Sequence, residues 1–208
     1  MSDQQRVGVS IDCRPVFPIF PMTIQRCIWA TNSDLEAEYH DREWGVPVHD
    51  ERTLFEFLTL EGAQAGLSWR TVLTKRANYA RVFLDYDLPR LAALDDDTLE
   101  QMLLDPGIVR NRLKVWSVRS NARAALALQA SQGSLDSYLW SFVGGQPIVN
   151  RPQSSSEVPA RTELSDRLSK DLRKRGFKFV GSTIIYAFMQ AVGMVDDHML
   201  GCHRYRSD

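Results

Sequence analysis

The sequence predicts an all-α fold. Apolar residues recur at helical spacing in one segment after another, and most of these segments follow a residue that can cap a helix. No stretch shows the sustained period-two alternation and hairpin turns that indicate an extensive sheet. A chain of 208 residues can bury a sizeable core. That length allows one domain or two small ones, and because 144–163 has the composition of a loop rather than of a domain boundary, we expect one main domain over residues 26–208.

Composition and cysteine usage limit the class of protein. The formal net charge of −1 gives no overall basic signal for nucleic acid, although a local basic patch is compatible with it. Cys13, Cys27 and Cys202 are too few and too widely spaced for a disulfide framework. The N-terminus lacks a signal-peptide pattern, and no apolar run approaches the ~20 residues that span a bilayer. We therefore expect a soluble, cytoplasmic protein, a monomer with no membrane partner.

The predicted elements follow in order along the chain. Residues 1–25 contain three prolines that interrupt both helix and strand, so an irregular leader is expected there. A short helix capped by Ser33 or Asp34 should end before Gly45. Later helices are expected after Asp50, after Ser68 as far as Phe83, at Leu88, after the acids at 95–97, after Pro106 and Gly107, after Ser134, and at 164–175 and 182–190. The last of these is apolar enough to be the central helix, and 144–163 should form a loop.

The segment at 54–69 contains the first candidate site. Leu54, Phe57 and Leu58 recur at helical spacing, and the next position on that face is Glu61. A buried carboxylate must find a partner or remain protonated. The chain is expected to loosen through the glycines at 62 and 66 before Trp69. With Tyr39 and Trp44, these residues suit a flat cationic or electron-poor ring, although four unrelated core or surface residues would have the same sequence.

A second candidate site joins the two ends of the domain. Cys27 and His40 near the start, with His198 and Cys202 near the end, form a set of donors that tetrahedral zinc accepts. No open coordination position is evident, so a structural role is favoured over a catalytic one. Unpaired buried cysteines and surface histidines are the alternative, and His203, His49 and Cys13 are possible substitute ligands.

A third candidate site is a turn with basic residues after it. Pro106 and Gly107 lie between two predicted helices, and the N-terminus of the second helix offers free N–H groups to an anion. Cationic side chains follow at Arg110, Arg112 and Lys114, and others cluster at 170–178. This pattern suits contacts to DNA phosphates, and an ordinary helix–helix turn is the alternative.

Several motifs resemble DNA-3-methyladenine glycosylase I. They are YHDREWGVP at 39–47, LEGAQAGLSW at 60–69 and KRGFKFVG at 174–181, with WSFV at 140–143 and the segment 197–202 fitting as well. The resemblance covers 26 to about 205. It implies a helix-hairpin-helix DNA glycosylase fold, with Pro106 and Gly107 as the hairpin, whose N- and C-terminal segments are joined by a zinc site. The implied zinc ligands are Cys27, His40, His198 and Cys202.

The resemblance also implies an activity and roles for the site residues. The expected reaction is hydrolysis of the N-glycosidic bond of 3-methyladenine in alkylated double-stranded DNA, within base excision repair. Glu61 is the expected catalytic residue, and Tyr39, Trp44 and Trp69 are the expected base-binding rings. Leu67, Pro106, Gly107 and Arg110 are the expected DNA contacts, with Leu67 as the wedge that fills the gap left by the extruded base.

Strand cleavage is not expected. Relatives that act as lyases place a lysine shortly after the hairpin, and the corresponding place here is near Asn111. One departure concerns Glu36, which occupies a position where the family often has a second tyrosine, so base preference could shift if it reaches the pocket. Two other functions stay open: a zinc-stapled module that binds DNA without catalysis, and an enzyme acting on a nucleobase or nucleoside outside DNA.

Overall fold

The computed structural model describes residues 24–206, so nearly all of the predicted leader lies outside the described residues. The fold is mostly helical, as predicted. The elements are η1 (Ile28–Thr31), α1 (Asp34–Arg42), α2 (Glu51–Gln64), α3 (Trp69–Leu73), α4 (Arg76–Val82), η2 (Leu84–Tyr86), α5 (Leu88–Ala92), α6 (Asp96–Leu104), α7 (Arg112–Gln132), α8 (Leu135–Ser141), β1 (Ile148–Val149), η3 (Ser155–Glu157), α9 (Glu163–Lys174), α10 (Ser182–Ala191) and β2 (Val195–Asp196). Among these residues, no helix is both long and apolar enough to cross a membrane.

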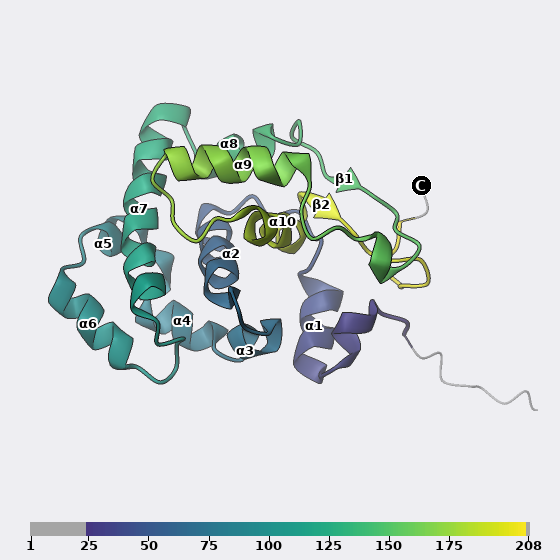
Figure 1. The fold of residues 1–208 in the computed structure, drawn as a ribbon, viewed down its shortest axis with the longest axis horizontal. Helices are drawn as coiled ribbons and strands as arrows, with labels where there is room; N and C mark the ends of the chain where they lie inside the picture. The colour runs from purple at the N-terminus through teal and green to yellow at the C-terminus, as the bar shows by residue number, and fades with distance from the viewer. Residues whose placement is uncertain (1–23, 207–208) are drawn as a thin grey trace, which may run out of the picture.

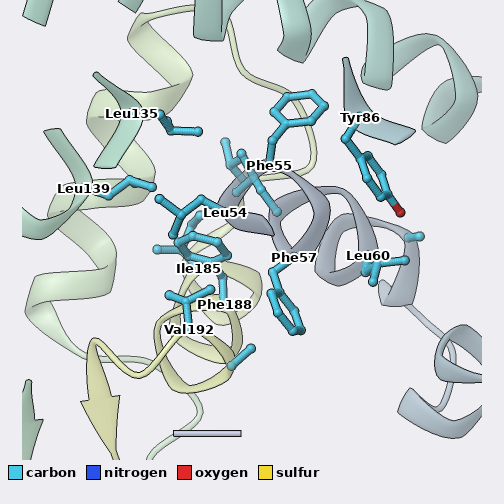
Figure 2. Close-up of a cluster of buried hydrophobic side chains, with 14 of the residues drawn as sticks. Leu54, Phe55, Phe57, Leu60, Tyr86, Leu135, Leu139, Ile185, Phe188 and Val192 are labelled. Carbon is cyan, nitrogen blue, oxygen red and sulfur yellow. The ribbon is translucent and has the colours of Figure 1, made fainter. Parts of the chain in front are cut away.

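Helices α2 and α10 form the centre of the molecule. They pack against each other, and α9 covers α10, while α7 stands to one side with α5 against it (Figure 1). Figure 2 shows side chains of α2 meeting those of α8 and α10 in the core. Ile185, Phe188 and Met189 are fully buried, which confirms the prediction that 182–190 is the central helix. Burial of such side chains stabilises the fold by about 1.5–3 kcal/mol each.

Side-chain caps fix the starts of most helices where the sequence predicted them. The side chains of Ser33, Asp50, Ser68, Asp95 and Ser134 each accept a hydrogen bond from the backbone N–H three residues later. These caps satisfy N–H groups that have no partner within the helix. Their agreement with the predicted boundaries shows that local chemistry sets the helix starts.

Two features differ from the prediction. The segment after Ser68 is not one helix, because α3 ends at Leu73 and α4 begins at Arg76. The Arg76 guanidinium at this break donates to Glu56 Oε1 at 2.7 Å and to Glu43 Oε2 at 2.6 Å, so ion pairs with α2 and with the residue that ends α1 hold the start of α4. A parallel pair of strands, β1 and β2, also lies in an otherwise helical fold. Each strand has two residues, which is too short for period-two alternation to reveal.

Candidate active site and metal cluster

Glu61 lies in the last turn of α2, on the buried face that its sequence spacing predicted. The residue is 4% exposed, and no hydrogen-bond donor among the described residues reaches its Oε2 atom. Burial alone raises the pKa of Glu61 to about 8. A carboxyl group that is buried without a partner loses hydration, which disfavours the charged form. The site is therefore arranged to gain from a donor or a cation that enters it.

Two aromatic rings stand beside this carboxyl group. Tyr39 comes from α1 and Trp69 is the first residue of α3, and their ring centroids are 5.2 Å apart. The indole N–H of Trp69 is buried and has no acceptor among the described residues. Trp44 is also buried, and its ring meets that of His198 edge-on at 4.6 Å. The three rings predicted for the pocket thus lie together.

These residues surround a cavity of about 390 Å³. It is lined by Trp29, Asn32, Glu36, Tyr39, Trp44, Glu61, Gln64, Trp69, Ser155, Val158, Ala187, Gln190, Asp197 and Met199. Apolar surfaces with a few polar groups are typical of sites for small heteroaromatic ligands. The cavity brings together residues from η1 to the C-terminal segment, so it depends on the whole fold.

Most of the other lining residues were not predicted as site residues, and three of them, Trp29, Gln190 and Asp197, make contacts that shape the cavity. Trp29 follows Cys27 in the sequence, and its ring contacts that of Trp44 at a centroid distance of 5.1 Å. Gln190 stands out as an amide within the apolar helix α10, and this polarity was the available signal. Its Nε2 donates to Asp197 Oδ2 at 2.7 Å. Asp197 begins the segment 197–202 that carries part of the family resemblance, but its residue type alone does not distinguish it from its neighbour Asp196.

The Glu36 side chain reaches the pocket. The sequence alone had left this question open. The side chain lies on α1 and is almost buried, at 7% exposed. Its Oε2 accepts hydrogen bonds from the Ser33 hydroxyl at 2.9 Å and from Arg70 Nε at 3.1 Å. The carboxylate in the pocket wall is thus paired with a guanidinium that does not itself line the cavity.

The four predicted metal ligands meet in one buried cluster. The ligand atoms of Cys27, His40, His198 and Cys202 all lie within 4.8 Å of one another. Cys202 Sγ is 3.4 Å from His40 Nε2 and 3.7 Å from His198 Nδ1, and Cys27 Sγ is 3.8 Å from His198 Nδ1. Donors bound to one tetrahedral zinc at 2.0–2.3 Å would be separated by roughly 3.3–3.8 Å. The cluster could therefore hold a metal ion, and its two thiols and two imidazoles suit zinc.

Neighbouring groups hold the two imidazoles in place. His40 Nδ1 is 2.9 Å from Asp41 Oδ1, which leaves Nε2 directed at Cys202. Hydrogen bonds from Arg26, the largest cause, hold the pKa of Asp41 well below its usual range. His198 packs against Gly45, where an added Cβ would lie 3.0 Å from Nε2 and where φ is +75°.

The substitute ligands have other positions. His203 Nε2 contacts Asp41 Oδ1 at 2.9 Å, so it lies outside the four-donor set. His49 stacks on Trp140, with ring centroids 4.5 Å apart, and its Nδ1 is 2.8 Å from Asp136 Oδ1. Cys13 lies outside the described residues. The structure therefore favours the four ligands first named.

The turn at Pro106 and Gly107 joins α6 to α7, as predicted. Asp105 Oδ1 accepts from Gly107 N at 2.7 Å, and Asn111 caps α7. Arg110 is exposed in this turn, and Leu67 is 41% exposed in the loop after α2. These positions leave both side chains accessible to a large partner.

Two expectations about nearby residues were wrong. Lys114 Nζ donates to the carbonyl oxygens of Ala63 and Ala65, at 2.7 Å each, so it holds the end of α2 instead of standing free for phosphate. Burial lowers the pKa of Lys114. The chain also does not loosen at Gly62, which is helical and lies against Phe179, so only Gly66, with φ of +81°, provides the expected turn.

The fold and the site together define a class of protein. It is a mostly helical protein with an aromatic pocket around a buried acid and with a separate thiol–imidazole cluster that joins its two ends. Such a pocket fits a flat heteroaromatic base.

Comparison with known proteins identifies the family. The family model for methyladenine glycosylase matches residues 29–205. The chain is 48% identical over 182 residues to DNA-3-methyladenine glycosylase 1 of Escherichia coli, covering 88% of this chain and 97% of the relative. It is 43% identical over 177 residues to DNA-3-methyladenine glycosylase of Haemophilus influenzae, covering 85% and 96%.

Solved structures agree with this assignment. A crystal structure of 3-methyladenine DNA glycosylase I superposes with a TM-score of 0.85 at 49% identity, covering 88% of this chain and all of that one. The Staphylococcus aureus enzyme, solved to explain its recognition of 3-methyladenine, gives a TM-score of 0.85 at 32% identity, covering 88% and 97%. This chain belongs to the methyladenine glycosylase family, so the resemblance seen in its motifs to DNA-3-methyladenine glycosylase I is confirmed.

Proposed function

We propose that this protein hydrolyses the N-glycosidic bond of 3-methyladenine in alkylated double-stranded DNA and leaves an abasic site. The observation that carries the proposal is Glu61, a buried acid with an unpaired oxygen in an aromatic pocket. The activity is the one named for its relatives in Escherichia coli and Haemophilus influenzae.

The chemistry of the substrate explains why such a pocket suffices. Methylation at N3 gives the base a positive charge while it is attached to the sugar, and cleavage releases it as a neutral molecule. The leaving group is therefore good without protonation. What the enzyme needs most is selection, which a buried acceptor supplies because a wrong base leaves it unpaired.

Glu61 acts in its charged form in this proposal. A cationic base entering the pocket lowers the pKa of the carboxyl group from its raised value, so the group ionises as the base binds. The carboxylate accepts a hydrogen bond from the exocyclic amine of the base. It also stabilises positive charge that develops on the sugar as the bond breaks, or orients the attacking water.

The surrounding side chains position the base. Tyr39 and Trp69 stack on it and Trp44 forms a wall, as their arrangement around the cavity allows. The base must leave the duplex to enter, and the exposed Leu67 fills the gap. The turn at Pro106 and Gly107 contacts the phosphate backbone as a helix-hairpin-helix motif, with Arg110 beside it.

We infer a hydrolase without lyase activity. A lyase needs a free amine to form a Schiff base. The lysines beside the hairpin are both engaged with carbonyl oxygens: Lys75 with that of Pro106, and Lys114 with those of Ala63 and Ala65. Lyase-type relatives also use an aspartate beyond the helix that follows the hairpin, and the first aspartate after Asp105 is Asp136. That residue pairs with His49 and does not line the pocket.

The thiol–imidazole cluster is proposed as a structural zinc site. Cys27, His40, His198 and Cys202 would hold the ion, and its chemistry would be to join the start of the domain to its end. All four residues are buried, which favours a closed site over one that admits substrate.

Base release from methylated duplex DNA tests the proposal. Free 3-methyladenine should appear, and Glu61→Gln should slow its release about 100-fold. Glu38→Gln is the matched control, because Glu38 is an exposed acid paired only with Arg42 in the described part of the chain. Full release by Glu61→Gln would refute the role of the carboxylate. Strand breaks formed without alkaline treatment would refute the assignment as a hydrolase alone, and duplex binding with no base release would favour a non-catalytic module.

A further inference from the structure

The ionisable groups that line the base pocket are unevenly distributed between acids and bases. Of the described residues that line the cavity, Glu36, Glu61 and Asp197 have carboxyl side chains, and none is a lysine, arginine or histidine. Both oxygens of Asp197 are engaged, because they accept from Asn150, Tyr186 and Gln190 at 2.7 Å each. Glu36 and Glu61 differ, since each has an oxygen that accepts no hydrogen bond from the described residues.

The two oxygens of Glu36 are used differently. Ser33 and Arg70 both donate to Oε2, while Oε1 accepts no hydrogen bond from the residues that the structure describes. Arg70 also donates to the Asn32 carbonyl oxygen at 2.8 Å, which fixes the guanidinium outside the cavity. The carboxylate is thus held in the pocket wall by one edge, with the other oxygen left for a ligand.

Glu36 and its partner Arg70 each lie close in the sequence to one of the two stacking rings. Glu36 precedes Tyr39 by three residues on α1, so the two side chains lie on one face of the helix. Arg70 follows Trp69 directly at the start of α3. The Glu36–Arg70 pair therefore joins the two helices that carry the stacking rings, and it places negative charge close to where the base would lie.

We propose that Glu36 is a specificity-determining residue that favours positively charged purines over neutral purines of the same shape. This inference rests on the proposed function, since it concerns the base that the same pocket accepts. The charge acts through the partly desolvated wall, where a carboxylate attracts a cation more strongly than in water. Arg70 cancels part of this attraction from outside and keeps the carboxylate in place.

Binding of two small ligands separates this charge effect from general damage to the pocket. The first is 3,9-dimethyladeninium, a permanent cation, and the second is 3-methyladenine, which is uncharged above neutral pH. Both are titrated at one fixed pH above neutrality by quenching of tryptophan fluorescence. Glu36→Gln is the informative variant, because glutamine can keep the hydrogen bond with Ser33 at the start of α1 while the charge is lost.

The proposal predicts that Glu36→Gln weakens binding of the cation about three- to tenfold and changes binding of the neutral base by less than about twofold. Glu38→Gln, which makes the same change on an exposed part of α1, should alter neither. Equal losses for both ligands, or unchanged binding of the cation, would overturn the proposal. If the unmodified protein releases no 3-methyladenine from methylated DNA, the proposed function fails instead, and the release assay shows this separately from the binding comparison.

Discussion

The base pocket and the thiol–imidazole cluster are both buried and polar, and they differ in how completely their groups are satisfied. In the pocket, Glu61 Oε2 and the Trp69 indole N–H have no partner among the described residues. In the cluster, sulfur and nitrogen atoms face one another at 3.4–3.8 Å, and Asp41 holds one of the imidazoles from outside. His198 Nε2 also has no partner among the described residues, but it is the Nδ1 atom of that ring that faces the two sulfurs. In the pocket the unsatisfied atoms mark where a ligand comes and goes, and in the cluster the set of facing donors marks where an ion would stay.

Removal of the metal proposed for the cluster should give the largest effect on folding. Cys202→Ala or a strong chelator should lower the free energy of unfolding by several kcal/mol, because the proposed ion would join Cys27 near the start to the C-terminal segment. Zinc content by mass spectrometry and the melting temperature measure this. Cys13→Ala is the matched control, as a thiol outside the described residues. A zinc content unchanged by Cys202→Ala would exclude the cluster as the metal site.

The pH dependence of base release should reveal the unsatisfied acid of the pocket. The pKa of Glu61 is raised to about 8, so below that pH the free protein carries it protonated. If the charged form binds the cationic base, kcat/KM should rise about tenfold per pH unit below pH about 8 and level off above it. A profile that is flat between pH 6 and 8 would contradict this prediction.

The raised pKa of Glu61 should make stability fall as pH rises, whereas it makes kcat/KM rise. Between the carboxyl group's ordinary pKa of 4.5 and about 8, the folded chain binds a proton at Glu61 that the unfolded chain has lost. This contribution to the free energy of unfolding should therefore fall as pH rises through that window, by ~1.4 kcal/mol per unit, and stay constant above it. Glu61→Gln should remove that fall, so it slows catalysis without destabilising the protein.

Lys114→Met should have a smaller effect on both properties. The lysine holds the end of α2, which positions both Glu61 and the loop with Leu67. Loss of its two hydrogen bonds should lower the free energy of unfolding by about 1–3 kcal/mol and slow base release several-fold. Chemical denaturation and the release assay measure the two effects. Unchanged stability would show that these hydrogen bonds do not hold the loop.

Arg110→Gln should give the smallest change, confined to DNA binding. This exposed side chain is proposed to contact a phosphate, so its loss should reduce the slope of log K against log salt by about one and leave the melting temperature unchanged. Arg52→Gln is a matched control, because Arg52 is an exposed arginine in the first turn of α2, at the end opposite Glu61. Equal effects of the two substitutions would argue against a specific role for the hairpin.

Local signals made much of this structure predictable. Helix starts followed from capping side chains such as Ser33 and Asp50, and the burial of Glu61 followed from its spacing with Leu54 and Phe57. The four ligand residues could be named as a set because cysteine and histidine are rare and chemically distinctive. In each case the cause lies within a few residues or in the residue type itself.

The features that could not be predicted depend on contacts distant in sequence. The break between α3 and α4 contains neither proline nor glycine, and the ion pairs of Arg76 with Glu56 and Glu43 accompany it. Lys114 looked like another cation near the hairpin, yet its partners are carbonyl oxygens about fifty residues earlier. Trp29 and Asp197 enter the pocket only because segments near the start and near the end of the described residues lie together there.

The central claim is that a cationic purine ionises a buried acid that lies beside two aromatic rings. The most direct measurement is the carboxyl carbon chemical shift of Glu61, followed by NMR against pH with and without 3,9-dimethyladeninium. The account predicts a pKa of about 8 in the free protein and a clearly lower one with the cation bound. A pKa near 4.5 in the free protein that the cation leaves unchanged would contradict it.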